Sequence, residues 1–251
     1  MKTVILIICA VAVICHSQKT CKIQNEFRLL SMKQHDSLSH RIFGYRFVIE
    51  GDFDGDGKKE KLAERLISLK DNKETDKYFI TEEPWEAIDS VIANRNYSFL
   101  ISDNLKIDTL RVGREGQVYG VSLLRNEGDL NGDGTDEVSY VGDWADYSSL
   151  NSWHIMTYKN NSWQELYSFG IWDWQLPDLP EATNQYGLFG TEGKVAVNDT
   201  LNQKLERDLL QWKGFVKKIK PNKIQITYRT DEAEIDSMTV NLKHPKKASK
   251  F

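Results

Sequence analysis

Two short acidic loops constrain this chain more than any other feature of its sequence. Residues 52–60 read Asp-Phe-Asp-Gly-Asp-Gly-Lys-Lys-Glu, and residues 129–137, which begin 77 positions later, read Asp-Leu-Asn-Gly-Asp-Gly-Thr-Asp-Glu. Both loops carry an oxygen-bearing side chain at positions 1, 3, 5 and 9, and both carry glycine at positions 4 and 6, where a chain can turn sharply. Segments with the alternation of β-strands flank both loops, so the fold has to hold each loop between two strands.

The oxygen pattern of both loops fits calcium. Ca²⁺ takes about six to eight oxygen ligands from a loop flexible enough to surround it, and alternate residues of a tight loop can point inward together. We expect side-chain ligands at positions 1, 3, 5 and 9 and a backbone carbonyl at position 7. The expected ligands are Asp52, Asp54, Asp56, Lys58 and Glu60 in the first loop and Asp129, Asn131, Asp133, Thr135 and Glu137 in the second.

The two expected sites differ in charge. The first loop offers four carboxylates and the second offers three plus an amide, so we expect the first loop to bind calcium more tightly. Without a cation, carboxylates this close repel one another. The alternative is a pair of metal-free turns, because Asp and Gly also serve turns. Repetition of the same nine-position pattern favours calcium.

The spacing excludes an EF-hand and matches another family of calcium loops. An EF-hand needs glutamate at position 12 and a helix on each side, but position 12 is Ala63 in one loop and Tyr140 in the other, and the flanks are strand-like. Residues 51–60 and 128–137 resemble instead the loop of FG-GAP and VCBS repeats, Asp-x-Asp/Asn-Gly-Asp-Gly-x-x-Asp/Glu.

This resemblance implies a fold as well as a ligand. In that family the loop joins neighbouring strands of a β-propeller blade and holds calcium. The resemblance covers roughly residues 43–70 and 118–170 and does not reach the C-terminal third. A closed propeller takes about four blades, and only two good loops are present. A closed propeller and an isolated propeller-like β domain therefore both remain open.

The remaining pattern predicts a mostly-β chain, with propeller-blade-like antiparallel sheets and a C-terminal helix plus β-hairpin. Apolar residues at helical spacing predict a helix that Pro221 ends, namely Leu201, Leu205, Leu209, Trp212 and Val216. The alternating segments 224–228 and 238–242 predict the hairpin. The expected divisions are a signal peptide at 1–17, an arm at 18–42, a β-rich domain with both loops at 43–190, and the helix and hairpin at 191–251.

The N-terminus predicts a secreted or periplasmic location. A basic start and an apolar run over residues 4–15 are typical of a signal peptide, with cleavage expected after Ser17. No other segment approaches the roughly 20 apolar residues of a membrane span. Cleavage leaves Cys21 as the only cysteine, so no internal disulfide is expected. Lipid attachment at Cys15 or Cys21 is less favoured, because neither follows a small residue.

Charge and motifs favour a binding module over an enzyme. Cleavage lowers the basic count from 33 to 32 against 37 acidic residues, and this acidic balance argues against nucleic-acid binding. No nucleotide-binding, zinc-protease or nucleophile-elbow motif occurs. We expect structural calcium in a module that recognises a protein or glycan.

The alternative is a hydrolase acting on glycans or phosphate esters, with Asp143 and Asp146 near its site. Trp172 and Trp174 would face the same way on a strand and can stack on a sugar ring, although packing is the commoner role of such a pair.

Overall fold

The computed structural model describes part of the chain, within the second of two units, residues 42–251. Strands predominate there, which confirms the mostly-β class. The expected signal peptide and arm, with Cys15 and Cys21, lie outside the described residues. The described residues are 45–75, 77, 89, 91–113, 117–145, 148–177, 189–190, 193–194, 199–212, 214–229 and 234–244.

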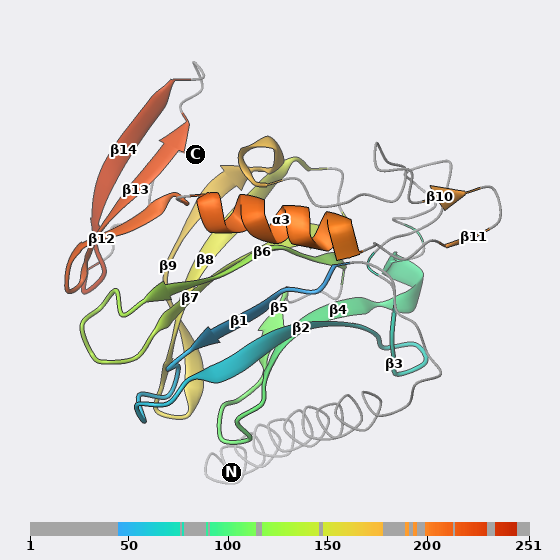
Figure 1. Ribbon diagram of the computed structural model, residues 1–251, viewed down its shortest axis with the longest axis horizontal. Helices are drawn as coiled ribbons and strands as arrows, with labels where there is room; N and C mark the ends of the chain where they lie inside the picture. Colours follow the sequence, from blue (N-terminus) through green and yellow to red (C-terminus); the bar gives the residue numbers. More distant parts are fainter. Residues whose placement is uncertain are drawn as a thin grey trace, which may run out of the picture. The chain divides into compact units, whose positions relative to one another are not determined.

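The first sheet is antiparallel, with the strand order β1-β2-β4-β5 and the short β3 paired to β2 (Figure 1). Its strands are β1 (Val48–Gly51), β2 (Glu60–Ser68), β3 (Lys73–Glu74), β4 (Asn96–Ser102) and β5 (Leu110–Val112). The first residues of β2 alternate between buried and more exposed, which is the period-two pattern that the sequence predicts.

The second sheet is a four-stranded antiparallel meander in the order β6-β7-β8-β9. Its strands are β6 (Val118–Gly128), β7 (Glu137–Trp144), β8 (Leu150–Lys159) and β9 (Ser162–Trp172). Asn160 and Asn161 join β8 to β9 with φ angles of 53° and 57°. Two successive positive φ angles define the type I′ turn of a tight hairpin, so β8 and β9 form such a hairpin.

The acidic loops occupy the same place in both sheets. The first loop joins β1 to β2, and the second joins β6 to β7, so each loop connects the first two strands of its sheet (Figure 1). The recurrent unit seen in the sequence is therefore a structural one: strand, acidic loop, strand and further strands.

The C-terminal segment differs from its prediction in two respects. Helix α3 (Asp199–Gln211) ends before Val216, because Gly214 adopts a left-handed φ of +68°. Val216 instead begins a strand, so the expected hairpin is a three-stranded sheet. Its strands are β12 (Val216–Lys220), β13 (Lys223–Arg229) and β14 (Ile235–Asn241), and the short β10 (Phe189–Gly190) and β11 (Gly193–Lys194) pair separately.

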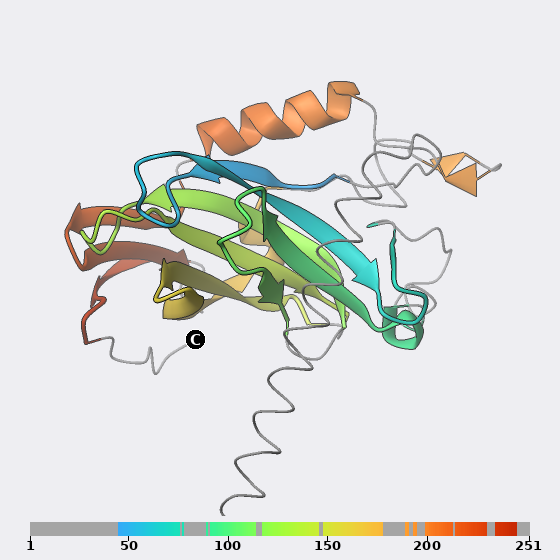
Figure 2. The same cartoon turned by 90° about the horizontal axis from the view of Figure 1, so that it is seen from below.

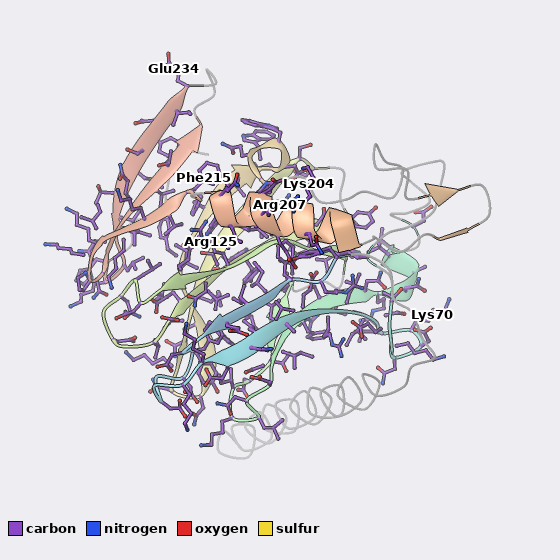
Figure 3. The ribbon with its side chains drawn as sticks, viewed as in Figure 1. Lys70, Arg125, Lys204, Arg207, Phe215 and Glu234 are labelled. Atoms are coloured by element: carbon purple, nitrogen blue, oxygen red, sulfur yellow. The ribbon has the colours of Figure 1, made fainter. Side chains whose placement is uncertain are left out.

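Helix α3 lies outside the sheets, along β1 and β6 (Figures 1 and 2). Its C-terminal end is tied to β6 by Arg125, whose Nη1 donates to the carbonyl of Trp212 over 3.0 Å. The guanidinium of Arg125 also lies 5.7 Å from the centre of the Trp212 ring, and the side chains of Arg125 and Phe215 lie near this end of the helix (Figure 3).

The second sheet is buried on both faces. Neighbouring residues of β8 divide between two apolar clusters: Met156 and Tyr158 pack with the first sheet, whereas Trp153 and Ile155 pack with the C-terminal sheet. The first cluster includes Phe47, Leu62, Leu100 and Val138, and the second includes Phe169, Val216, Ile224, Ile226 and Val240. This double burial explains why the first six residues of β7 are all buried.

Candidate metal centre

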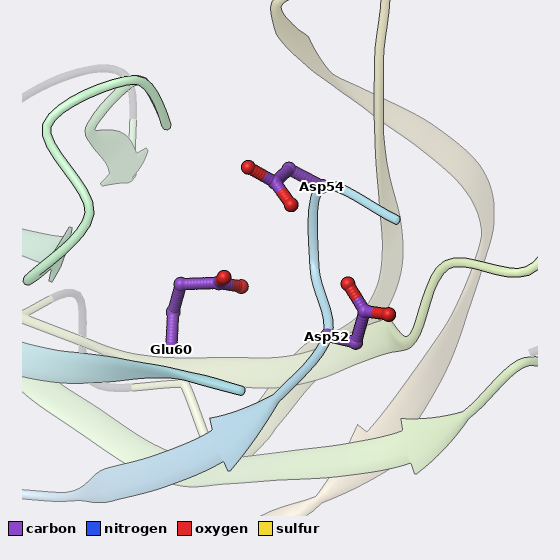
Figure 4. Close-up of side chains that lie close together, drawn as sticks. All are labelled: Asp52, Asp54 and Glu60. Carbon is purple, nitrogen blue, oxygen red and sulfur yellow. The ribbon is translucent and has the colours of Figure 1, made fainter. Parts of the chain in front are cut away.

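Three carboxylates of the first loop converge. Asp52, Asp54 and Glu60 each present an oxygen, and these oxygens all lie within 4.8 Å of one another (Figure 4). Glu60 is buried at the start of β2, and the two aspartates are half-buried in the loop. The three carboxylates therefore come from both ends of the loop and meet at one point.

Backbone N–H groups hold these carboxylates in place. Asp52 accepts from Gly55 and Gly57, each over 2.9 Å. Glu60 accepts from the N–H of Phe53 over 3.1 Å, and Asp54 accepts from that of Asp56 over 3.1 Å. The two glycines have φ angles of +77° and +84°, which side chains with a Cβ rarely adopt. The glycines thus allow the turn that brings the ligands together.

The second loop repeats this backbone arrangement. Gly132 and Gly134 have φ angles of +84° and +93°. Four hydrogen bonds match those of the first loop: Gly132 N–H to Asp129 Oδ1 (2.5 Å), Asp133 N–H to Asn131 Oδ1 (2.8 Å), Thr135 N–H to Asp133 Oδ1 (3.2 Å) and Leu130 N–H to Glu137 Oε2 (2.5 Å). The counterpart of the third bond in the first loop runs from Lys58 N–H to Asp56 over 2.9 Å.

An apolar residue at position 2 anchors each loop, and the metal-ligand pattern of the sequence did not predict this role. Phe53 is fully buried in the cluster beside the first sheet, and Leu130 is 1% exposed in the cluster beside the C-terminal sheet. An apolar residue between two expected ligand residues, at the same position of both loops, was the available signal.

The acidic side chains of the second loop do not converge in the same way. In the described part of the chain, the first loop alone supplies three acidic, histidine or cysteine side chains that meet the distance of a metal site. The amide of Asn131 donates to Glu137 over 2.8 Å, and Lys159 Nζ lies 3.3 Å from Asp133. Lys218 Nζ donates to the carbonyl of Asp129 and lies 4.0 Å from its carboxylate. The ammonium groups of Lys159 and Lys218 therefore pair with carboxylates of this loop.

Asp56 also departs from the expected convergence. Its carboxylate lies 3.4 Å from Nζ of Lys58 and is outside the three-carboxylate cluster. The structure thus brings together three of the four carboxylates predicted for the first site.

Burial changes the acidity of several loop carboxylates. It raises the pKa of Glu60, opposed by the Phe53 N–H. Burial raises the pKa of Glu137 to about 7, opposed by hydrogen bonds from Asn131 and Leu130. Burial also acts to raise the pKa of Asp133, but hydrogen bonds from Thr135 and Lys159 outweigh it and lower the value overall. A cation would favour the charged form of all three.

The other candidate residues lie away from this centre. Asp143 is half-buried on β7, whereas Asp146 lies outside the described residues. Nδ1 of His154 lies 2.6 Å from Glu165. Trp172 ends β9, but Trp174 lies in the 3₁₀ turn Asp173–Gln175, so the expectation that both tryptophans share a strand is wrong. Both are exposed, by 42% and 54%.

Comparison of the chain with protein-family models, with curated proteins and with solved structures finds no match. Among the described residues, no helix combines the length and apolar character needed to cross a membrane. Function therefore has to be inferred from the two loops themselves.

Proposed function

We propose that the protein binds Ca²⁺ at its first acidic loop through Asp52, Asp54 and Glu60. The observation that carries this proposal is the convergence of their oxygens within 4.8 Å. Ca²⁺ binds oxygens at about 2.3–2.6 Å, so two oxygens on one ion lie at most about 5 Å apart. Asp56 and the carbonyl of Lys58 complete the proposed ligand set, once Asp56 turns away from the Lys58 ammonium.

The second loop is a weaker site of the same kind. Its backbone matches the first loop, and its proposed ligands are Asp129, Asn131, Asp133, Glu137 and the carbonyl of Thr135. Lys159 has to leave Asp133 before an ion enters, and Glu137 has to lose its proton. Both steps reduce the affinity of this loop relative to the first.

The proposed role of the ions is structural, in a secreted or periplasmic module that recognises a protein or glycan. Each loop joins the first two strands of a sheet, so an ion fixes that connection. The chain has three cysteines, and two lie in the segment expected to be cleaved. Calcium would therefore supply the cross-links that a disulfide gives to other secreted proteins.

A calcium titration of the chain from residue 18 tests this proposal. At a Ca²⁺ concentration 100-fold above Kd, binding stabilises the folded state by about 2.7 kcal/mol, which raises Tm by several degrees. The Asp54→Asn variant should lose most of this rise. The matched control Asp71→Asn, an exposed aspartate outside both loops, should keep it. No calcium-dependent rise in the unsubstituted chain would exclude the proposed sites.

A further inference from the structure

The two acidic loops contact each other directly. The N–H of Asp136 donates to the carbonyl of Asp52 over 2.8 Å, and the N–H of Asp52 donates to Oδ2 of Asp136 over 3.2 Å. Asp52 is a proposed ligand of the first loop, whereas Asp136 lies between Thr135 and Glu137, two proposed ligands of the second. Both backbone polar groups of one ligand are therefore held by a residue of the other loop.

Asn126 reinforces this junction. Its Nδ2 donates to Oδ2 of Asp136 over 2.9 Å and to the carbonyl of Glu50 over 2.8 Å. The approach is close at Gly51: a Cβ there would lie 2.5 Å from Asn126 Nδ2, 2.7 Å from Phe53 Cε1 and 2.9 Å from Asp136 Oδ2. A side chain at this position would therefore displace the groups that form the junction.

We propose that Asp136 joins the two loops into one unit, so that Ca²⁺ at either loop strengthens Ca²⁺ binding at the other. This inference rests on the proposed function. An ion that fixes Asp52 also fixes Asp136, and with it the adjacent Thr135 carbonyl and Glu137 carboxylate. The second ion then meets a loop that is already ordered, so less conformational entropy is lost on binding.

Repulsion between two bound ions opposes this coupling. The carboxylates around each ion offset its charge, and dissolved salt screens the exposed parts of the loops. The proposal requires the ordering effect to exceed the repulsion that remains. Asp136 acts as a positioning residue, because its carboxylate binds an N–H of a ligand residue and the amide of Asn126.

Calorimetry on four backgrounds, each with and without a substitution that disables one loop, measures the coupling. Asp54→Asn disables the first, tighter loop and should weaken Ca²⁺ at the second loop at least about five-fold. In an Asp136→Ala background, the same substitution should change that affinity by less than about two-fold. Asp136→Asn keeps an acceptor oxygen and should restore the coupling, and Asp71→Ala should leave it intact. An equal effect of Asp54→Asn with and without Asp136 would overturn the proposal, as would no effect in the intact chain.

Amide hydrogen exchange without calcium separates this proposal from the calcium sites. The amides of Gly55 and Gly57 are held by the carboxylate of Asp52. Asp136→Ala should make both exchange about ten-fold faster, whereas Asp71→Ala should not. Unchanged exchange would overturn the joining of the loops. Faster exchange in a chain that binds no calcium would refute the proposed function and retain the junction.

Discussion

A buried ion pair connects the two large sheets and gives a sharp prediction of stability. Glu64 on β2 and Lys77 are 1% and 6% exposed, and their charged groups lie 2.9 Å apart. The carboxylate also accepts the N–H of Phe47 over 3.1 Å and that of Val121 on β6 over 2.7 Å. Lys77 Nζ donates to the carbonyl of Val121 over 2.7 Å. One carboxylate therefore binds donors from three segments of the chain.

Replacing Glu64 with leucine removes the acceptor of the Phe47 and Val121 N–H groups and the ion-pair partner of Lys77. Removal of one partner from a buried ion pair costs about 3–5 kcal/mol, and each buried N–H left without an acceptor costs about 1–3 kcal/mol. These costs overlap, so we expect Glu64→Leu to lower the free energy of unfolding by at least about 4 kcal/mol, out of a typical total of about 5–15 kcal/mol. The double variant with Lys77→Met should be more stable than Glu64→Leu alone, because it removes the stranded ammonium.

The pH dependence has a defined sign. Burial lowers the pKa of Lys77, and loss of the Glu64 charge lowers it further. The unfolded chain then binds the proton more tightly than the folded chain, so the stability of Glu64→Leu should rise as pH increases toward the unfolded pKa of about 10.4.

Urea unfolding followed by tryptophan fluorescence in EDTA measures these changes, since the chain has seven tryptophans. The matched control is Glu50→Leu, which removes the carboxylate of an exposed pair 3.6 Å from Lys61 and should cost less than about 1 kcal/mol. A loss below about 1 kcal/mol for Glu64→Leu, or a double variant less stable than that single variant, would refute the reasoning.

Three further predictions concern the second loop and Glu127, on the adjoining strand β6. Ca²⁺ binding at the second loop should weaken about ten-fold from pH 8 to pH 6, because Glu137, with a pKa of about 7, must release its proton. Calorimetry in buffers of different ionisation enthalpy should detect that proton release. An affinity that stays constant between these pH values would contradict the prediction. Burial raises the pKa of Glu127 to about 7, so the folded chain keeps a proton that the unfolded chain loses between about pH 4.5 and 7. Stability therefore falls across that window, and Glu127→Gln should raise the free energy of unfolding by about 3 kcal/mol at pH 8 but not at pH 4. Gly132→Ala should lower Tm more than Gly134→Ala. Both glycines have a positive φ, but only a Cβ at Gly132 would meet Pro221, at 2.6 Å. An equal decrease in Tm for the two variants would exclude that contact.

The strands and the loops were predictable because their signals are local. Alternating segments on either side marked the strands that flank each loop, and the nine-position pattern marked both loops. The end of α3 was missed because Val216 continues the helical spacing by coincidence, although Gly214 marked the stop.

The partners of the second loop were not predictable, since Lys218 reaches it across 89 positions and Asn222 across 91. Glu64 and Lys77 resembled ordinary surface charges, and only the packing of the two sheets buries them.

The contact between the second loop and the C-terminal sheet also sets an order of assembly. The carbonyls of Asp129, Leu130 and Asn131 accept hydrogen bonds from Lys218 on β12 and from Asn222 in the turn between β12 and β13. Synthesis at about 5–20 residues per second makes that turn several seconds after the loop. The nascent chain must therefore carry an incomplete second loop until β12 and β13 emerge, whereas two partners of the first loop, Asn104 at 2.9 Å from Asp54 and Asp136 at Asp52, are made before then.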